Sequence, residues 1–394
     1  MADNNWVKLC FVAMEQYIPD VCDNQNSVNQ FKMIFEHATS VANNYELYSN
    51  NRYEKIRTSD MYEKIGDNCD DCAMYDYAIQ NYSKSLQLRE HNLGKRHRKT
   101  AIVMDNIGLI YTKMARFNDA ISYHKKAIII LETYVGKEDE DTAIAYSNMG
   151  LALVRKGNYA DSIKWYVKCL NIEKKLYGEF HLEIAADYNN LGEVYIKKEE
   201  YEKAIKYLLK ALKIKTDIIG INNPNTAITL NNLGSTYWRI GELEKAREYS
   251  NQSLKIYKSI FGDNHPSTSL GYNNLASILA DMGNMKVAEQ YYRQSLQSEI
   301  KTYGFYHPET ALSLYNIGKL YYDEDNGERG LPYFFAAYKI YFSLLDKEHE
   351  DLLRVVNHIK MVYRKTKLQL DFDEWLKEKT TKSIEELVEV CDFE

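Results

Sequence analysis

The sequence predicts an all-α protein, an α-solenoid of stacked antiparallel helix pairs, and three observations lead to this prediction. Small residues recur every 42 residues, apolar residues around them follow a helical spacing, and linkers with glycine and proline separate the units. A fixed internal period of this length is typical of repeat architectures. The chain has 394 residues, 45% of them hydrophobic, which is enough to give every unit a buried core.

The column of small residues defines the repeat. Steps of 42 residues in both directions from Gly192 reach six glycines and one alanine, and one further step reaches Lys360 in a degenerate copy of the motif. The column consists of Gly66, Gly108, Gly150, Gly192, Gly234, Ala276 and Gly318. A second column of small residues lies twelve positions later, and an aromatic column lies three positions beyond it from the second repeat onward. So many columns in phase predict a tandem array.

Each unit is expected to hold two helices. Residues at −4, −1, 0 and +3 around the glycine are apolar or small, as in Tyr188, Leu191, Gly192 and Tyr195, and this spacing marks one face of a first helix. The second helix carries the second small residue and the aromatic column. Small residues let the two helices approach closely, and aromatic rings fill the space between them, which accounts for the 34 tyrosines.

Linkers and ends follow the same logic. FGDNHPST (261–268) and YGFYHPET (303–310) place glycine where a helix ends and proline where the next begins. We expect an N-terminal helical cap over 1–51, the array over 52–365 with a degenerate last repeat, and C-terminal capping helices and a tail over 366–394. Ser383 and Glu386 have the spacing of a capping box. Such ends are needed because a terminal repeat otherwise exposes an apolar face.

The order of small residue, tyrosine, turn, alanine and aromatic resembles the tetratricopeptide repeat (TPR). Residues 230–269 look like the 42-residue repeats of kinesin light chains, and the resemblance covers roughly residues 52 to 365. It implies a right-handed superhelix of about eight TPR units whose first helices line a concave groove. Kinesin light chains carry a long heptad region before their repeats. The 51 residues before this array show no sustained heptad, so we expect that region to be lacking.

Composition narrows the class of protein. The net charge is −6 with acidic and basic residues interspersed, so no nucleic-acid partner is expected. No apolar run reaches about 18 residues, so no membrane insertion is expected. The start has no basic segment before its apolar stretch and predicts no signal peptide. Six cysteines form no disulfide framework, and a cytoplasmic protein is expected.

A second face of the first helix carries the candidate binding residues. Positions −6, −2, +1 and +5 fall roughly opposite the core stripe. Position −2 is asparagine in six successive repeats, although asparagine costs some tenths of a kcal/mol in a helix relative to alanine. These residues are Asn106, Asn148, Asn190, Asn232, Asn274 and Asn316. The TPR resemblance implies that they clamp the main chain of a bound peptide, for which an amide offers both donor and acceptor. Alternatively, they bond neighbouring first helices, and the two roles are compatible.

The neighbouring columns have simpler alternatives. The −3 asparagines (Asn189, Asn231 and Asn273) are expected to be structural. Position +5 is basic in Lys113, Arg155, Lys197 and Arg239, then acidic in Asp281 and Asp323. This pattern is either ordinary charge at a helix end or a preference for an acidic peptide, or a free carboxylate, at one end of the groove. Apolar −6 residues are expected to form peptide pockets: Ile144, Ile228, Leu270 and Leu312.

The sequence therefore predicts a non-catalytic adaptor or scaffold that binds a peptide of a partner protein. The alternative is a regulatory sensor switched by a peptide or by the acidic tail EELVEVCDFE. No cofactor and no metal are expected. Cys69 and Cys72 have a metal-like spacing, but structural zinc needs four ligands, and Cys69 falls in a core column. No phosphate-binding loop or nucleophile elbow is present. Self-association and binding on the convex face stay open.

Overall fold

The computed structural model describes residues 2–19, 25–365 and 371–389. Throughout these residues the regular structure is helical, and no strand occurs. The chain divides into two compact bodies, Met1–Glu200 and Tyr201–Glu394, which we call the N-terminal and C-terminal bodies. The predicted all-α solenoid of helix pairs is confirmed.

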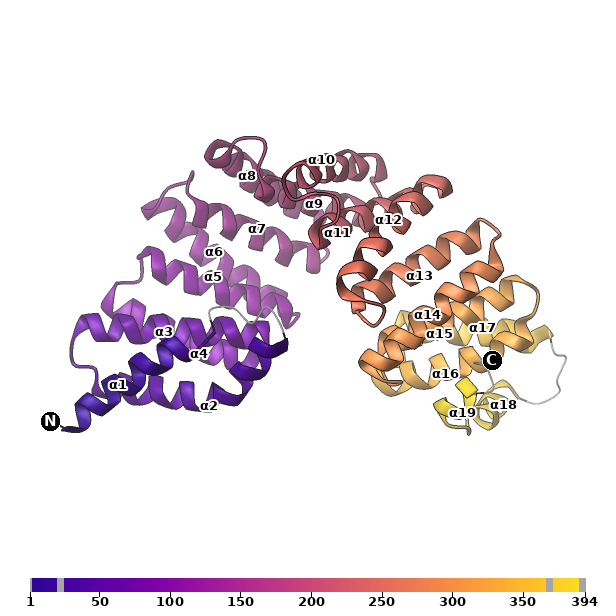
Figure 1. The fold of residues 1–394 in the computed structure, drawn as a ribbon, viewed down its shortest axis with the longest axis horizontal. Coiled ribbons are helices and arrows are strands. Elements are labelled where there is room, and N and C mark those ends of the chain that lie inside the picture. The colour runs from indigo at the N-terminus through magenta and orange to yellow at the C-terminus, as the bar shows by residue number, and fades with distance from the viewer. Residues whose placement is uncertain (1, 20–24, 366–370, 390–394) are drawn as a thin grey trace. The chain divides into compact units, whose positions relative to one another are not determined.

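The N-terminal body contains helices α1 to α9 (Figure 1). Its helices are α1 (Ala2–Tyr17), α2 (Gln25–Tyr48), α3 (Arg52–Asp71), α4 (Tyr75–Asn92), α5 (Arg98–Lys113), α6 (Phe117–Tyr134), α7 (Glu140–Arg155), α8 (Tyr159–Tyr177) and α9 (Leu182–Lys197). Helices α3 and α4, α5 and α6, and α7 and α8 pack as pairs, and each second helix also contacts the next first helix.

The C-terminal body continues this order (Figure 1). Its helices are α10 (Tyr201–Ile219), α11 (Pro224–Arg239), α12 (Leu243–Phe261), α13 (Pro266–Asp281), α14 (Met285–Tyr303), α15 (Pro308–Asp323), α16 (Gly327–Leu344), α17 (Glu350–Lys365), α18 (Phe372–Lys379) and α19 (Ile384–Glu389). Helices α17 and α19 both pack on α16.

The linkers end and start helices as their residues predict. Gly262 adopts a φ of +78°, a left-handed conformation that costs glycine little, and it ends α12. His265 then caps α13, because its Nδ1 accepts the backbone N–H of Ser267, and Pro266 occupies the first turn. The Thr268 hydroxyl donates to the carbonyl of Gly262 at 2.8 Å and closes the linker.

The glycine column marks a close approach of two helices, as predicted, but the ring that fills the space lies one position later than expected. A Cβ at Gly150 would lie 2.9 Å from the ring of Tyr166, and one at Gly108 would lie 2.7 Å from His124. Both rings are sixteen positions after their glycine. The predicted aromatic column, at fifteen, stacks at the edge of the pair, as Tyr237 and Tyr249 do with ring centroids 5.5 Å apart.

Helices also form at both ends of the array. In the N-terminal body, the Phe11 ring of α1 stacks on Tyr45 of α2 with centroids 3.9 Å apart. In the C-terminal body, Ser383 and Glu386 form the predicted capping box: the Ser383 N–H donates to the Glu386 carboxylate at 2.7 Å, and the Glu386 N–H donates to the Ser383 hydroxyl at 3.1 Å. None of the helices in the described ranges is long and apolar enough to cross a membrane.

Candidate functional site

The six −2 asparagines are half-buried, so they lie nearer the core than a position opposite the core stripe. Three of them bond to the preceding first helix of the same body. The Nδ2 atoms of these asparagines donate to residue −3 of the preceding repeat: Asn148 to Asp105 at 2.7 Å, Asn274 to Asn231 at 2.9 Å, and Asn316 to Asn273 at 3.3 Å. This geometry supports the structural alternative, in which the asparagines link neighbouring repeats.

The same asparagines keep binding capacity. Among the described residues, nothing donates a hydrogen bond to the Oδ1 atoms of Asn148, Asn274 and Asn316. A peptide N–H has an acceptor there without any loss of the inter-repeat bond. Asn106 on α5, Asn190 on α9 and Asn232 on α11 occupy equivalent half-buried positions. Peptide clamping by the six asparagines thus stays a prediction.

The −3 asparagines are structural, as expected. Asn273 is 6% exposed and donates to the Ser313 hydroxyl at 2.7 Å on the next first helix. Asn189 is also 6% exposed and donates to the carboxylate of Glu193 at 2.8 Å. Asn231 accepts the bond from Asn274.

The charged +5 side chains are all exposed, but most have partners. The partnered ones are Lys113, 2.6 Å from Asp70; Asp281, which accepts from Trp238 Nε1 at 2.6 Å; Asp323, 2.6 Å from Lys319; and Arg239, 5.7 Å from the Trp238 ring. These contacts fit the ordinary structural interpretation. Arg155 and Lys197 differ, because neither forms an ion pair with any residue that the structure describes.

A pocket in the N-terminal body brings Arg155, Asn190 and Lys197 together. It has a volume of about 290 Å³ and lies among α7, α8 and α9. Its lining consists of Leu151, Val154, Arg155, Tyr159, Tyr166, Asn190, Glu193, Val194 and Lys197. The exposed charged residues of the lining are Arg155, Lys197 and Glu193, so the pocket has a net positive charge.

Buried residues make the floor of this pocket. Val194 is 1% exposed and Tyr166 is 3% exposed. Burial raises the pKa of Tyr166, with a further contribution from the nearby Glu193 charge, so the phenol stays neutral. The floor is thus an uncharged surface below charged side chains.

The apolar −6 residues do not line this pocket. Ile144 and Leu270 are each 48% exposed and Ile228 is 42% exposed, so three of the four present apolar surface to solvent. Leu312 is partly buried and packs against the core of the C-terminal body. That these four residues form pockets for peptide side chains stays a prediction.

A larger pocket of about 620 Å³ lies in the C-terminal body among α12, α13 and α14. It contains none of the predicted site residues, because second helices contribute most of its lining and the predicted residues all lie on first helices. Its charges are largely compensated inside the pocket, as where Arg247 lies 2.6 Å from Glu244. We therefore take the pocket among α7, α8 and α9 as the candidate binding site.

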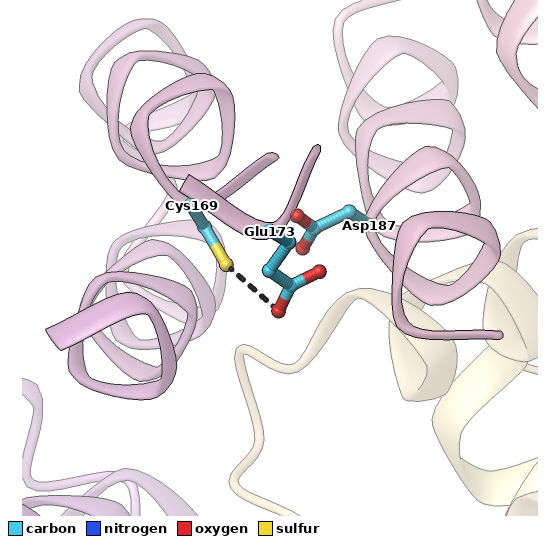
Figure 2. Close-up of side chains that lie close together, drawn as sticks. All are labelled: Cys169, Glu173 and Asp187. Carbon is cyan, nitrogen blue, oxygen red and sulfur yellow. Dashed lines mark hydrogen bonds between the residues drawn. The ribbon is translucent and has the colours of Figure 1, made fainter. Parts of the chain in front are cut away.

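A buried cluster of Cys169, Glu173 and Asp187 lies outside every sequence prediction (Figure 2). Burial raises the pKa of Asp187 to about 8, and the Glu173 charge adds to this shift. Burial likewise raises the pKa of Glu173. The predicted metal-like pair is a separate feature: Cys69 is fully buried in the core, as expected, and Cys72 is partly buried.

A family model described as tetratricopeptide repeat matches residues 57–133, 141–217, 183–259, 225–298 and 267–326, which together cover more than half of the chain. No curated protein matches the sequence.

Solved structures share the fold at low identity. The apo form of the quorum sensor NprR from B. thuringiensis is similar with a TM-score of 0.60 and 15% identity, over 86% of this chain and 87% of that one. BtubC (BKLC) from P. vanneervenii has a TM-score of 0.50 and 19% identity, over 64% and 93%. A putative kinesin light chain protein from Podosopora anserina, with nearly identical TPR-like repeats, has a TM-score of 0.46 and 16% identity, over 52% and 98%. By its family match and its helix pairs in phase, the chain belongs to the tetratricopeptide repeat family.

Proposed function

We propose that this protein is a non-catalytic adaptor that binds a peptide segment of a partner protein, and that the pocket among α7, α8 and α9 receives an acidic residue of that peptide. The observation that supports this most strongly is the pair Arg155 and Lys197. These two cations lack ion-pair partners in the described structure and flank the half-buried Asn190 over an uncharged floor.

Each group has a chemical task in this proposal. A carboxylate of the peptide accepts two parallel hydrogen bonds from the Arg155 guanidinium, while Lys197 acts as a point charge. The Asn190 amide bonds the peptide main chain through its donor and its acceptor. Leu151 and Val154 offer partly buried apolar surface for a neighbouring side chain. The TPR family is generally one of protein-interaction modules, which agrees with this assignment.

A second candidate is a sensor that changes shape when a peptide binds. The similarity to the quorum sensor NprR favours it, because that structure covers most of this chain. The described part of the acidic tail is used elsewhere: Ile384 and Leu387 of α19 are buried in the core of the C-terminal body. Residues 390–394 lie outside the described structure. The sensor is therefore proposed with a separate peptide as its ligand.

The compartment is part of the proposal. None of the four cysteines in the described ranges is in a disulfide, which fits a reducing compartment such as the cytoplasm.

The test is a binding screen of the full chain against a random peptide library at two salt concentrations, followed by fluorescence polarisation with an enriched peptide. We expect acidic and apolar peptides that bind more weakly as salt rises. The double variant Arg155→Glu/Lys197→Glu should lose at least about tenfold in affinity, or about 1.4 kcal/mol. Lys125→Glu is the matched control, an exposed lysine on α6 outside the pocket.

The outcomes separate the candidates. Equal loss in the control and the double variant would reject the pocket, because any reversal of charge would then suffice. A radius of gyration that is unchanged on binding, measured by X-ray scattering, supports the adaptor, whereas a changed radius supports the sensor. No enriched peptide at all would contradict both.

A further inference from the structure

Three buried side chains converge where α8 packs against α9. Cys169 and Glu173 are one turn apart on α8, and Asp187 projects from α9 toward them (Figure 2). One ligand atom from each lies within 4.8 Å of the other two, and the Cys169 thiol donates a hydrogen bond to Glu173 Oε1, with an S···O distance of 3.5 Å. The exposed fractions are 0% for Cys169, 7% for Glu173 and 2% for Asp187.

The cluster contains polar atoms that the protein leaves without partners. Glu173 Oε2 and Asp187 Oδ2 are buried, and neither has a hydrogen-bond partner among the described residues. A buried carboxylate oxygen without a partner is costly, and two adjacent carboxyl groups add repulsion when both are ionised.

Charged residues at equivalent positions in other repeats pair with groups of the protein, although Glu299 Oε2, like Glu173 Oε2, has no partner in the described structure. Steps of 42 residues from Glu173 reach three buried charged residues, Arg89, Lys215 and Glu299, and three buried apolar or aromatic residues, Leu131, Tyr257 and Tyr341. Arg89 donates to Glu63 and Asp60, Lys215 donates to the Thr229 hydroxyl at 3.0 Å, and Glu299 accepts from Ser269 at 2.6 Å and from Ser295 at 2.9 Å. Among the four charged residues, Glu173 alone faces a thiol and a second acid.

We propose that Cys169, Glu173 and Asp187 bind one Zn²⁺ ion that joins α8 to α9. In a tetrahedral zinc site with the usual Zn–S and Zn–O lengths, the sulfur and oxygen ligands lie about 3.5 Å apart, which is the separation of Cys169 Sγ and Glu173 Oε1. A thiolate ligand favours zinc over the oxygen-seeking Ca²⁺ and Mg²⁺. The ion offsets the negative charge of the cluster, and water or a second carboxylate oxygen completes its coordination.

Coordination requires deprotonated ligands. The Cys169 thiol loses its proton to solvent as the Zn–S bond forms, and any proton on the Glu173 or Asp187 carboxyl group leaves in the same way. No electron is transferred. Because the cluster is buried, zinc enters most readily while the chain folds, so the experiment includes refolding.

The test uses the full chain refolded from denaturant with Zn²⁺ or with a chelator, then gel-filtered and analysed for metal by mass spectrometry. We expect about one zinc per chain after refolding with Zn²⁺ and a higher melting temperature than that of the chelator-treated protein. Cys169→Ser and Asp187→Asn should lose both the zinc and this temperature difference. Cys10→Ser, at an exposed cysteine on α1, should keep both.

Refolding with Co²⁺ adds a direct signature. Wild type should show the near-ultraviolet charge-transfer absorption of a cobalt–thiolate bond, and Cys169→Ser should lack it. If Cys169→Ser does not fold, the nearly isosteric Asp187→Asn decides whether the site exists, because its melting temperature in Zn²⁺ falls if a zinc ligand is lost and rises if only repulsion between two acids is relieved. Loss of zinc and of the zinc-dependent stability supports the site.

Two outcomes overturn the proposal. If wild type retains no zinc and Asp187→Asn stabilises the protein, the two acids simply share a proton, and the amide relieves their repulsion. If the zinc content is the same in all the variants, the metal is bound elsewhere.

Discussion

Replacing Glu299 by glutamine should remove a loss of stability that wild type suffers as the pH rises toward neutrality. Glu299 lies on α14 and is 2% exposed. Its Oε1 accepts hydrogen bonds from Ser269 and Ser295, while its Oε2 is buried without a partner in the described structure. Burial raises the pKa of Glu299 to about 7, although the serine hydroxyls act in the opposite direction.

The sign follows from proton binding. The ordinary pKa of a glutamic acid in an unfolded chain is about 4.3, so the folded state binds this proton more tightly. The stabilising contribution is complete below about pH 4.3 and is lost as the pH rises to about 7. At 1.36 kcal/mol per pKa unit, the loss is about 3 to 4 kcal/mol. Glutamine does not ionise, so the stability of Glu299→Gln relative to wild type should rise by this amount over the same range.

A constant offset accompanies this slope. The glutamine amide places N–H groups where Oε2 has no partner, which costs about 1–3 kcal/mol at every pH. The test is therefore how the stability difference between Glu299→Gln and wild type changes with pH, and not its value at one pH. Because repeat arrays unfold in segments, hydrogen exchange of the α14 amides is measured beside urea denaturation between pH 4.5 and 8. Glu348→Gln, at an exposed glutamate, is the control. Parallel pH curves for wild type and Glu299→Gln would refute the reasoning.

Three further substitutions probe other parts of the array. Gly330→Ala puts a Cβ 2.6 Å from the carbonyl oxygen of Gly318, so thermal denaturation should show a loss of about 1–3 kcal/mol, and unchanged stability would contradict this close approach. Arg89→Met removes a guanidinium that is 1% exposed and paired with two acidic side chains of α3; urea unfolding should show a loss of about 3–5 kcal/mol, and a loss under 1 kcal/mol would be inconsistent with a buried ion pair. Asn148→Ala leaves the buried carboxylate of Asp105 without one hydrogen bond, which costs about 1–3 kcal/mol and exceeds the helix-propensity gain of about 0.5 kcal/mol, so circular dichroism should show a lower melting temperature. An unchanged melting temperature would contradict a structural role for this bond.

The repeat made the fold predictable from sequence. Forty-two-residue spacing locates the close approach at Gly150, the proline of the linker locates the start of α13 at Pro266, and the capping box locates α19 at Ser383. Each signal is local or strictly periodic, so helix type and order follow without knowledge of distant contacts.

The candidate site was only partly predictable, because it depends on which side chains neighbouring repeats present. Lys113 and Lys197 hold the same repeat position, yet only Lys113 has an acid within reach on the preceding first helix. Cys169 and Asp187 lie on different helices with a linker between them, at no spacing typical of metal ligands. Such contacts depend on the particular residues that neighbouring repeats bring together, and the pattern shared by all repeats does not contain this information.

The buried charges at the repeat interfaces bear on how the chain finds its register. A chain of near-copies can pair a second helix with the first helix of the wrong repeat, because apolar columns are alike in every copy. The polar partners are not alike. Arg89 of α4 pairs with Asp60 and Glu63 of α3, whereas Ile228 and Asn231 hold the equivalent positions on α11. Arg89 packed against α11 would therefore be a buried charge without its two acids. Breaking a buried ion pair costs about 3–5 kcal/mol. A misregistered pairing of helices that separates such a pair is therefore less stable than the native pairing.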